Sequence, residues 1–395
     1  MYNEPIYLDN HSTTKLDPRV LDAMMPFFTT HYGNSSSQHY FGYFASEAVS
    51  IARKKVASLL NANDNEIIFT SGATESNNLV LKGIVESYRS HGNHIITSKI
   101  EHSSVIDVCK KLEQKGISVT YLSVDRDGNI DLDELKNSIT EKTILVSIMF
   151  GNNEIGTIAP IKEIVNICHS SEILFHTDAT QCAGNIKLDI KELGIDLLSF
   201  SAHKLHGPKG IGALYVKSTT PKILLSSQID GGGHEKNIRS GTLNVPAIIG
   251  FGKAAEICKN EMQVSSEFVL RLRNKFEENM ENVSGVTING NKLSRLPNNT
   301  HLTIQNVKIK DLIRKVKGVV FSTHAACSSS DNSQSHVLNS IGMNKENIDS
   351  SARFGFCRMN TEEEVISATN IFTNAINELR NSNNIIITQK QNINN

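Results

Sequence analysis

The sequence predicts an α/β protein with a large, mostly parallel sheet wrapped by helices and a smaller α+β unit. The first observation is that short β-branched apolar runs alternate with helical patterns between about residues 15 and 260. Such alternation is typical of a parallel sheet covered by helices. The second is a long, charged helical stretch at residues 262–281, which is expected to begin the smaller unit. The third is that polar motifs follow the predicted strands, where open α/β sheets bind their ligands.

The predicted elements follow one another in a regular order, each strand being a short run rich in Val, Ile, Leu or Phe. We expect strands at 66–69, 94–97, 118–124, 143–150, 174–177, 197–200 and 211–216, and helices at 54–61, 76–90, 105–114, 131–139 and 161–170. These elements make the large domain, residues 15–260. The small domain takes residues 1–14 and 261–380, with strands at 286–288, 301–304 and 319–322 and a last helix at 361–379. Residues 381–395 are rich in Asn, Gln and Ile, and we predict a disordered tail.

Composition and charge exclude several classes of protein. A chain of 395 residues suits one enzyme subunit, and 39% hydrophobic and 21% charged residues are ordinary for a globular protein. A net charge of −1 gives no electrostatic footprint for nucleic acid or an anionic membrane. No apolar run reaches membrane-spanning length and no leader pattern opens the chain, so we expect a cytoplasmic protein. The six cysteines include no Cys-x-x-Cys, so we predict neither a bound metal nor disulfides.

The most informative segment is the polar turn that joins the last two predicted strands of the large domain. It reads Ser-Ala-His-Lys-Leu-His-Gly-Pro-Lys-Gly at 201–210. Hydroxyl, imidazole, amine and glycine groups at a strand end favour binding of an anion and presentation of one amine. A lysine that forms a Schiff base with pyridoxal phosphate needs such a setting, because its neighbours hold the phosphate and its own pKa must be lowered. The turn alone also fits an ordinary basic hairpin.

Asp178 makes the cofactor interpretation stronger, because it ends the apolar run at 174–177. A carboxylate beside a pyridine nitrogen keeps that nitrogen protonated, and the ring then acts as an electron sink. One strand–turn–strand excursion separates Asp178 from Lys204, so both side chains can reach one ring. The motif Thr-Ser-Gly-Ala-Thr at 70–74 follows another strand and opens a helix, whose backbone amides would form a phosphate site.

These motifs, in this order, resemble those of the cysteine desulfurases, in class V of the fold-type I pyridoxal-phosphate aminotransferases. The similarity runs from Tyr-Leu-Asp-Asn at 7–10 to Arg-Phe-Gly-Phe-Cys-Arg at 353–358, which is nearly the whole chain. Cys327, in a Ser- and Ala-rich string, fits the branch with the longer, mobile cysteine loop. The resemblance implies that L-cysteine becomes L-alanine, that a persulfide forms on Cys327, and that its sulfur passes to an acceptor protein.

The resemblance also implies a role for each residue of the catalytic and cofactor sites. Lys204 would carry the cofactor, with Lys209 as its rival, and the Cys327 thiolate would be the nucleophile. His102 would stack on the ring and move protons. Asp178 would pair with the pyridine nitrogen and Gln181 with the phenolic oxygen of the ring. The expected phosphate site is Ala73, Thr74, Ser201, His203 and, from the second subunit of a homodimer, Thr242.

The substrate would be held by Asn153, Asn34 and Arg353, whose planar guanidinium matches a carboxylate bidentately. Arg358 is a less favoured rival for that carboxylate. Each residue also has a structural alternative: a surface lysine, a turn aspartate, a packed histidine or a salt-bridged arginine. The cysteines other than Cys327 are expected to be packing residues.

The sequence departs from the family pattern at several positions. His11 and His324 stand where smaller residues are usual, and the string at 332–336 is atypical. The C-terminus lacks the apolar ending by which similar enzymes dock an iron–sulfur scaffold. The His-Ala-Ala-Cys string is more similar to desulfurases of DNA phosphorothioate modification. The acceptor pathway is therefore left open among iron–sulfur cluster assembly, tRNA thiolation and DNA phosphorothioation.

Two other kinds of function remain as alternatives. The same fold serves aminotransferases and β-lyases, and neither reaction needs a thiol at position 327. A scaffold subunit that keeps the fold without catalysis is the other alternative. The presence of Lys204, Asp178, His102 and Cys327 together argues against it.

Overall fold

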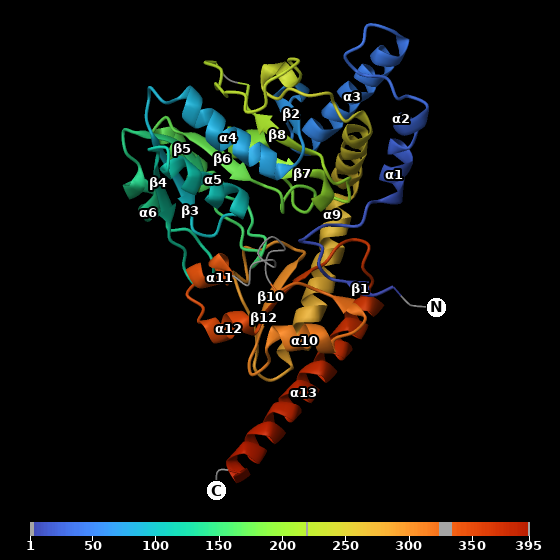
Figure 1. Cartoon of the computed structure of the whole chain (residues 1–395), viewed down its shortest axis with the longest axis vertical. Coiled ribbons are helices and arrows are strands. Elements are labelled where there is room, and N and C mark those ends of the chain that lie inside the picture. Colours follow the sequence, from blue (N-terminus) through green and yellow to red (C-terminus); the bar gives the residue numbers. More distant parts are fainter. Residues whose placement is uncertain (1–3, 219, 324–333, 394–395) are drawn as a thin grey trace.

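The computed structural model describes residues 4–218, 220–323 and 334–393, and its largest element is a seven-stranded sheet (Figure 1). The strand order is β2-β8-β7-β6-β5-β3-β4. All pairings among β3 to β7 are parallel, while β8 is antiparallel to both of its neighbours. The predicted mostly parallel sheet is thus confirmed. The strands are β2 (Ile67–Thr70), β3 (His94–Ser98), β4 (Ser118–Leu122), β5 (Thr143–Ser147), β6 (Leu174–Asp178), β7 (Leu197–Ser201) and β8 (Gly212–Val216).

Helices cover both faces of this sheet because successive side chains of each central strand point to opposite faces. Ile67 and Phe69 of β2 pack into the cluster that includes α3 and α9, whereas Ile68 packs into the cluster that includes α4 and α5. The helices of this part are α1 (Pro18–Met24), α2 (Pro26–Thr29), α3 (Tyr40–Leu59), α4 (Ala73–Ser87), α5 (Ser103–Glu113), α6 (Leu132–Ser138), α7 (Ile161–Ser170), α8 (Ile190–Leu193) and the short turns η1 (Asp64–Glu66), η2 (Ala202–Lys204) and η3 (Glu235–Asn237).

A second group of elements has its own sheets and its own apolar core. β12 (Ser351–Gly355), β10 (Asn299–Ile304) and β9 (Val286–Ile288) form an antiparallel sheet. The chain's first strand, β1 (Ile6–Tyr7), pairs in parallel with β11 (Val319–Val320). The core is aromatic, with Phe276, Phe354 and Phe372 in mutual contact. The remaining helices of this group are α10 (Ile309–Lys315), α11 (His336–Ser340) and α12 (Lys345–Asp349).

The long helix α9 (Val245–Glu281) joins the two groups, as Figure 1 shows. Its first half packs against the large sheet through Phe251, and its second half packs into the aromatic core through Phe276. We predicted a helix only from residue 262, which is wrong. The missed part contains Gly252, a weak helix former that is needed there because a Cβ would lie 2.7 Å from Cα of Ala52. The domain boundary at residue 260 stays a prediction, because one helix runs through it.

The last helix, α13 (Glu362–Ile393), reaches into residues 381–395, for which the disordered tail stays a prediction. The helix extends away from the rest of the molecule (Figure 1). Residues 362–393 contain neither proline nor glycine, so nothing in the sequence ends the helix earlier. In the part of the chain that the structure describes, no helix is both long and apolar enough to span a membrane.

Candidate active site

A cavity of about 430 Å³ lies where β2, β3, β5, β6 and β7 end. This is the edge at which open α/β sheets bind ligands. Motifs that are far apart in the chain meet there, as the sequence predicted. The predicted site residues that line it are Ala73, Thr74, His102, Asn153, Asp178, Gln181, Ser201, His203, Lys204 and Arg353.

Two of the predicted residues that the structure describes, Asn34 and Thr242, are not part of this lining. Asn34 is exposed, and its side chain accepts a hydrogen bond from the backbone amide of Ser36. Thr242 is exposed as well. Cys327, like His324, lies outside the described residues. Lys209, the rival of Lys204, lines the cavity but is an exposed side chain.

The N-terminal segment fixes the turn that carries Lys204. The amine of Lys204 donates to the carbonyl oxygens of His11 and Ser12, the latter at 2.9 Å. The hydroxyl of Thr14 donates to the carbonyl of His203 at 2.8 Å and accepts from the amide of His206 at 2.9 Å. Lys204 is therefore held on both sides, by its own amine and by the backbone around it.

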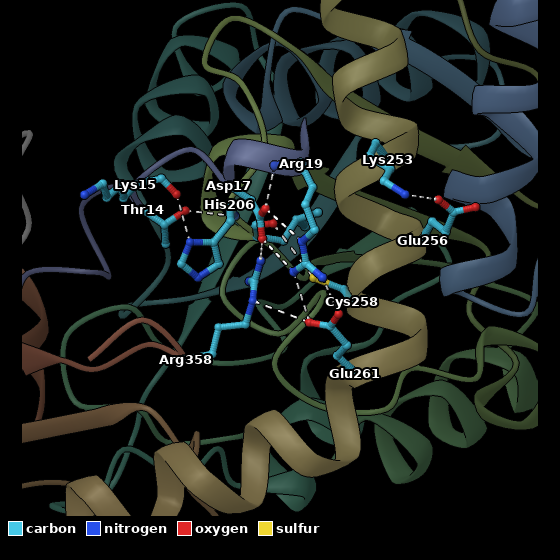
Figure 2. A network of polar contacts seen from close by, with 11 residues as sticks. Thr14, Lys15, Asp17, Arg19, His206, Lys253, Glu256, Cys258, Glu261 and Arg358 are labelled. Atoms are coloured by element: carbon cyan, nitrogen blue, oxygen red, sulfur yellow. Dashed lines mark hydrogen bonds and ion pairs between the residues drawn. The ribbon is translucent and has the colours of Figure 1, made fainter. Parts of the chain in front are cut away.

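A group of ion pairs behind this turn holds the N-terminal segment in place (Figure 2). Asp17 caps α1 and its amide donates to the carbonyl of His206 at 3.0 Å. Arg19 and Arg358 both donate to the carboxylate of Asp17, and Glu261 of α9 accepts from Arg19. The hydrogen bonds from Arg19, together with those from Arg358, hold the pKa of Asp17 well below its usual range. Arg358 does not line the cavity, so its geometry fits the structural alternative.

Asp178 is oriented by a side chain that the sequence reading missed. Nδ2 of Asn77 donates to one oxygen of Asp178 at 2.7 Å, and the amide of Thr180 donates to the other at 3.0 Å. Asn77 is fully buried and lies one turn into α4, on the same face as Ala73. It belongs to the motif at 70–78, and its spacing from Ala73 is the only signal that could have singled it out.

His102 is the N-cap residue of α5, and the cap fixes its tautomer. The amide of Ser104 donates to Nδ1 of His102 at 3.1 Å. Because Nδ1 accepts this hydrogen bond, the proton of the neutral ring resides on Nε2. Burial lowers the pKa of His102, with a further contribution from Lys204, so the ring is neutral near pH 7. It can therefore both give and take a proton at the cavity.

The surroundings of Arg353 fit both roles that the sequence left open, a structural salt bridge and a site for the substrate carboxylate. It lies on β12, is 1% exposed and forms an ion pair with Asp9 at 3.0 Å. Its guanidinium also donates to the carbonyl of Asn153 at 2.9 Å and to the hydroxyl of Ser12 at 2.7 Å. Among the described residues, however, Nε of Arg353 has no hydrogen-bond partner. The side chain is thus anchored at the cavity, and one buried N–H of its guanidinium has no partner among the described residues.

The start of α4 offers an anion site of the kind that a phosphate requires. The first amides of a helix have no intrahelical partner, and the segment from Ser71 to Glu75 lines the cavity. A Cβ built on Gly72 would meet only Oγ of Ser201, at 3.8 Å, so the space in front of this loop is open. Ser201 and His203 lie on the same wall.

The residues on the opposite wall fit the ring of pyridoxal phosphate. Nε2 of Gln181 and the amine of Lys204 both donate to the carbonyl oxygen of His11, so these two groups are neighbours. The phenolic oxygen and the aldehyde carbon of the cofactor are on adjacent ring atoms and need such a pair. Asp178 lies in the same cavity for the ring nitrogen, and the volume is ample for the cofactor with a small amino acid.

Both chain segments that flank Cys327 attach to the cavity wall. Ser322 exchanges backbone hydrogen bonds with Arg353, at 2.8 and 3.2 Å. On the other side, the hydroxyl of Ser335 donates to the buried carboxylate of Glu154 at 2.6 Å, and Nε2 of His336 lies 2.8 Å from the carbonyl of Glu101. The described residues on either side of Cys327 therefore lie beside the substrate-binding candidates Arg353 and Asn153.

The chain is similar to known proteins along almost its whole length. The family model described as Aminotransferase class-V matches residues 6–367. A cysteine desulfurase IscS of Rickettsia massiliae (strain Mtu5) is 47% identical over 378 residues, which cover 95% of this chain and 92% of the relative. The solved structure of a NifS-like protein has a TM-score of 0.89 at 37% identity, covering 94% of this chain and 99% of that chain. DndA from Streptomyces lividans has a TM-score of 0.76 at 32% identity, covering 90% and 99%.

These similarities confirm the predicted family, the cofactor and the reaction class, and they argue against the aminotransferase, β-lyase and scaffold alternatives. The chain belongs to the class-V aminotransferase family and, within it, to the pyridoxal-phosphate-dependent cysteine desulfurases.

Proposed function

We propose that the residues of this cavity divide the desulfurase reaction between proton transfer, done by Lys204 and His102, and sulfur transfer, done by Cys327. The observation that carries this proposal is the convergence of a held amine, a held carboxylate and a guanidinium on one cavity. Lys204, Asp178 and Arg353 supply these groups, and both segments that flank Cys327 attach beside them.

Substrate binding follows from the guanidinium of Arg353. This guanidinium is assigned to the α-carboxylate of L-cysteine, because its buried Nε–H has no partner among the described residues, while Asp9 and Ser12 both accept from Nη2. Asn153 lies beside it, since its carbonyl accepts from the same guanidinium. This anchoring fixes the direction of the substrate, so that its α-carbon lies toward Lys204.

Pyridoxal phosphate, when bound, supplies the electron sink that makes the α-proton of cysteine acidic. The amine of Lys204 takes this proton, because the carbonyls of His11 and Ser12 hold it at the cavity. His102 holds a proton at Nε2, and this proton is available to the substrate when its bond to sulfur breaks.

Cys327 accepts the sulfur as a thiolate. A bond forms between Sγ of Cys327 and the substrate sulfur while the bond between that sulfur and Cβ of the substrate breaks. The electron pair of the broken bond stays with the substrate, which takes up a proton and leaves as L-alanine. No external oxidant is needed, because the enzyme sulfur is oxidised to a persulfide as the substrate carbon is reduced.

We further propose iron–sulfur cluster assembly as the use of this sulfur, with tRNA thiolation and DNA phosphorothioation as alternatives. The similarity to a cysteine desulfurase IscS, at 47% identity over almost the whole chain, supports the first of these uses. A cytoplasmic location fits the need for reduced acceptor thiols.

A homodimer is also part of the proposal, with Thr242 reaching the phosphate site of the partner. Thr242 is exposed and does not line the cavity of its own chain. Large aromatic side chains at the start of α3 also remain exposed, which supports a covered face there. They are Tyr40, Phe41 and Tyr43. Light scattering of the active protein should give about twice the 43.5 kDa chain mass, and a single-chain mass would contradict this.

The decisive experiment compares wild type with Cys327→Ser. The variant should bind pyridoxal phosphate and turn yellow, but it should release no alanine and carry no persulfide, because a serine hydroxyl is a far weaker nucleophile at neutral pH. Cys109→Ala is a matched control, since Cys109 is a buried residue of α5 and burial raises its pKa to about 12. Alanine release by Cys327→Ser at the wild-type rate would overturn the proposed role of the thiol.

A further inference from the structure

We propose that His11 is a positioning residue that holds the amide of Gln181 with its NH2 group toward the cofactor. The proposal rests on the proposed function, in which Gln181 donates to the phenolic oxygen of pyridoxal phosphate.

The first argument is that His11 contacts both ends of one amide. Nδ1 of His11 lies 2.8 Å from Oε1 of Gln181, and Nε2 of Gln181 donates to the carbonyl oxygen of His11 at 3.2 Å. Only an NH2 group can face a carbonyl oxygen favourably, so this contact fixes which end of the amide is nitrogen. The same NH2 group lies next to the amine of Lys204, which donates to the same carbonyl.

The second argument is a count of protons. The other ring nitrogen, Nε2 of His11, lies 3.2 Å from the carbonyl oxygen of Asn298. Both ring nitrogens therefore face oxygens, whereas a neutral imidazole has only one N–H. The shorter contact is to Gln181, which places the proton on Nδ1. The contact with Asn298 is then a packing contact.

The imidazole ring of His11 is neutral, so it carries a single N–H proton. His11 is 1% exposed, and burial is the largest cause that lowers its pKa to about 3. Arg353 from β12 and Lys204 from η2 lower it further, while Asp9 and the hydrogen bond with Gln181 raise it. A second proton is thus absent near pH 7.

The other tautomer would reverse the amide. With its proton on Nε2, His11 would donate to Asn298, and Nδ1 could only accept from Gln181. The amide of Gln181 would then turn, and its oxygen would face the phenolic oxygen of the cofactor. Two acceptors in contact repel each other, so this arrangement weakens cofactor binding.

The test measures the cofactor rather than turnover. Apo-protein is titrated with pyridoxal phosphate by equilibrium dialysis, and the pH midpoint of the bound cofactor's visible absorbance is recorded. For His11→Ala we expect pyridoxal phosphate to bind about tenfold more weakly and the pH midpoint of its absorbance to rise. The reason is that the phenolic oxygen loses the NH2 group of Gln181 as a donor and then holds the neighbouring proton more tightly. Gln181→Ala should give the same changes, and the double variant should add nothing to them.

Two further variants separate positioning from packing. His11→Asn keeps a side-chain donor and should restore most of the wild-type midpoint. His94→Ala removes another buried histidine, which contacts Thr120 and Thr143 away from the cavity, and should change thermal stability only. The proposal would be overturned if His11→Ala bound pyridoxal phosphate with the wild-type affinity and the wild-type pH midpoint. It would also be overturned if His11→Ala caused an equal shift in a protein that already carries Gln181→Ala. Failure of wild-type protein to bind the cofactor would instead refute the proposed function.

Discussion

Arg353 and Arg358 stand close together in the sequence, and each pairs with an aspartate of the N-terminal segment, yet they end in different surroundings. Arg353 lines the cavity with Asp9 as its carboxylate partner, and its Nε has no partner among the described residues. Arg358 lies behind the Lys204 turn, where it contacts Asp17 and approaches Glu261 (Figure 2).

The different surroundings of Arg353 and Arg358 indicate which of the two arginines is available to a ligand. Around Asp17, the two cations Arg19 and Arg358 face the two carboxylates of Asp17 and Glu261, so the charges are balanced without a ligand. Arg353 has one carboxylate partner, lines the cavity, and keeps a buried N–H that has no partner among the described residues. The residue type and the ratio of cations to carboxylates are the same in both cases, so the place of Arg353 at the cavity is what distinguishes it.

The largest expected effect follows from Arg353→Ala. We expect kcat/KM for L-cysteine to fall about 100- to 1000-fold, because a buried charged pair with the substrate carboxylate is worth several kcal/mol. Pyridoxal phosphate should still bind, as its yellow colour would show. Alanine production by Arg358→Ala is the comparison and should fall only a few-fold. A greater loss in Arg358→Ala would reverse the assignment of the two arginines.

Arg358→Ala should instead act on stability. Its removal leaves buried Asp17 with the half-exposed Arg19 as partner, so we expect the free energy of unfolding to fall by about 2–4 kcal/mol. Urea denaturation followed by circular dichroism measures this change. An unchanged midpoint would mean that the ion pairs do not hold the Lys204 turn in place.

The same variant should show a particular pH dependence. The pKa of Asp17 is lowered in the folded state, so its contribution to stability is complete above its unfolded pKa, about 4. That contribution is lost as the pH falls toward the folded pKa. The stability difference between wild type and Arg358→Ala should therefore be constant from pH 7 to 5 and shrink below about pH 4. A difference that grows with acidity would contradict the assignment to Asp17.

The smallest effect is expected from Arg19→Ala. Arg19 donates two hydrogen bonds to Asp17, but its side chain is 49% exposed, and water screens such a pair. We expect less than about 1 kcal/mol of lost stability and unchanged alanine production. A loss as large as that of Arg358→Ala would show that exposure does not separate the two partners of Asp17.

The sequence by itself determined the parts of this protein that depend on neighbouring residues. The alternation of strands and helices predicted the mostly parallel sheet, and Lys204, Asp178 and His102 were found because each follows an apolar strand. Parallel strands bring their carboxyl ends to one edge, so local motifs were enough to place these side chains in one cavity. The cysteine desulfurase family was predicted for the same reason, since its motifs are short and ordered.

Only the tertiary structure decided which distant groups pair. The contact of Asn77 with Asp178 and the contact of His11 with Gln181 join residues that are over a hundred positions apart, and no spacing rule predicts them. The buried N–H of Arg353, which has no partner among the described residues, and the ion pairs around Arg358 are likewise consequences of packing. A motif specifies a side chain and a strand end, whereas its hydrogen-bond partners depend on where the rest of the chain folds.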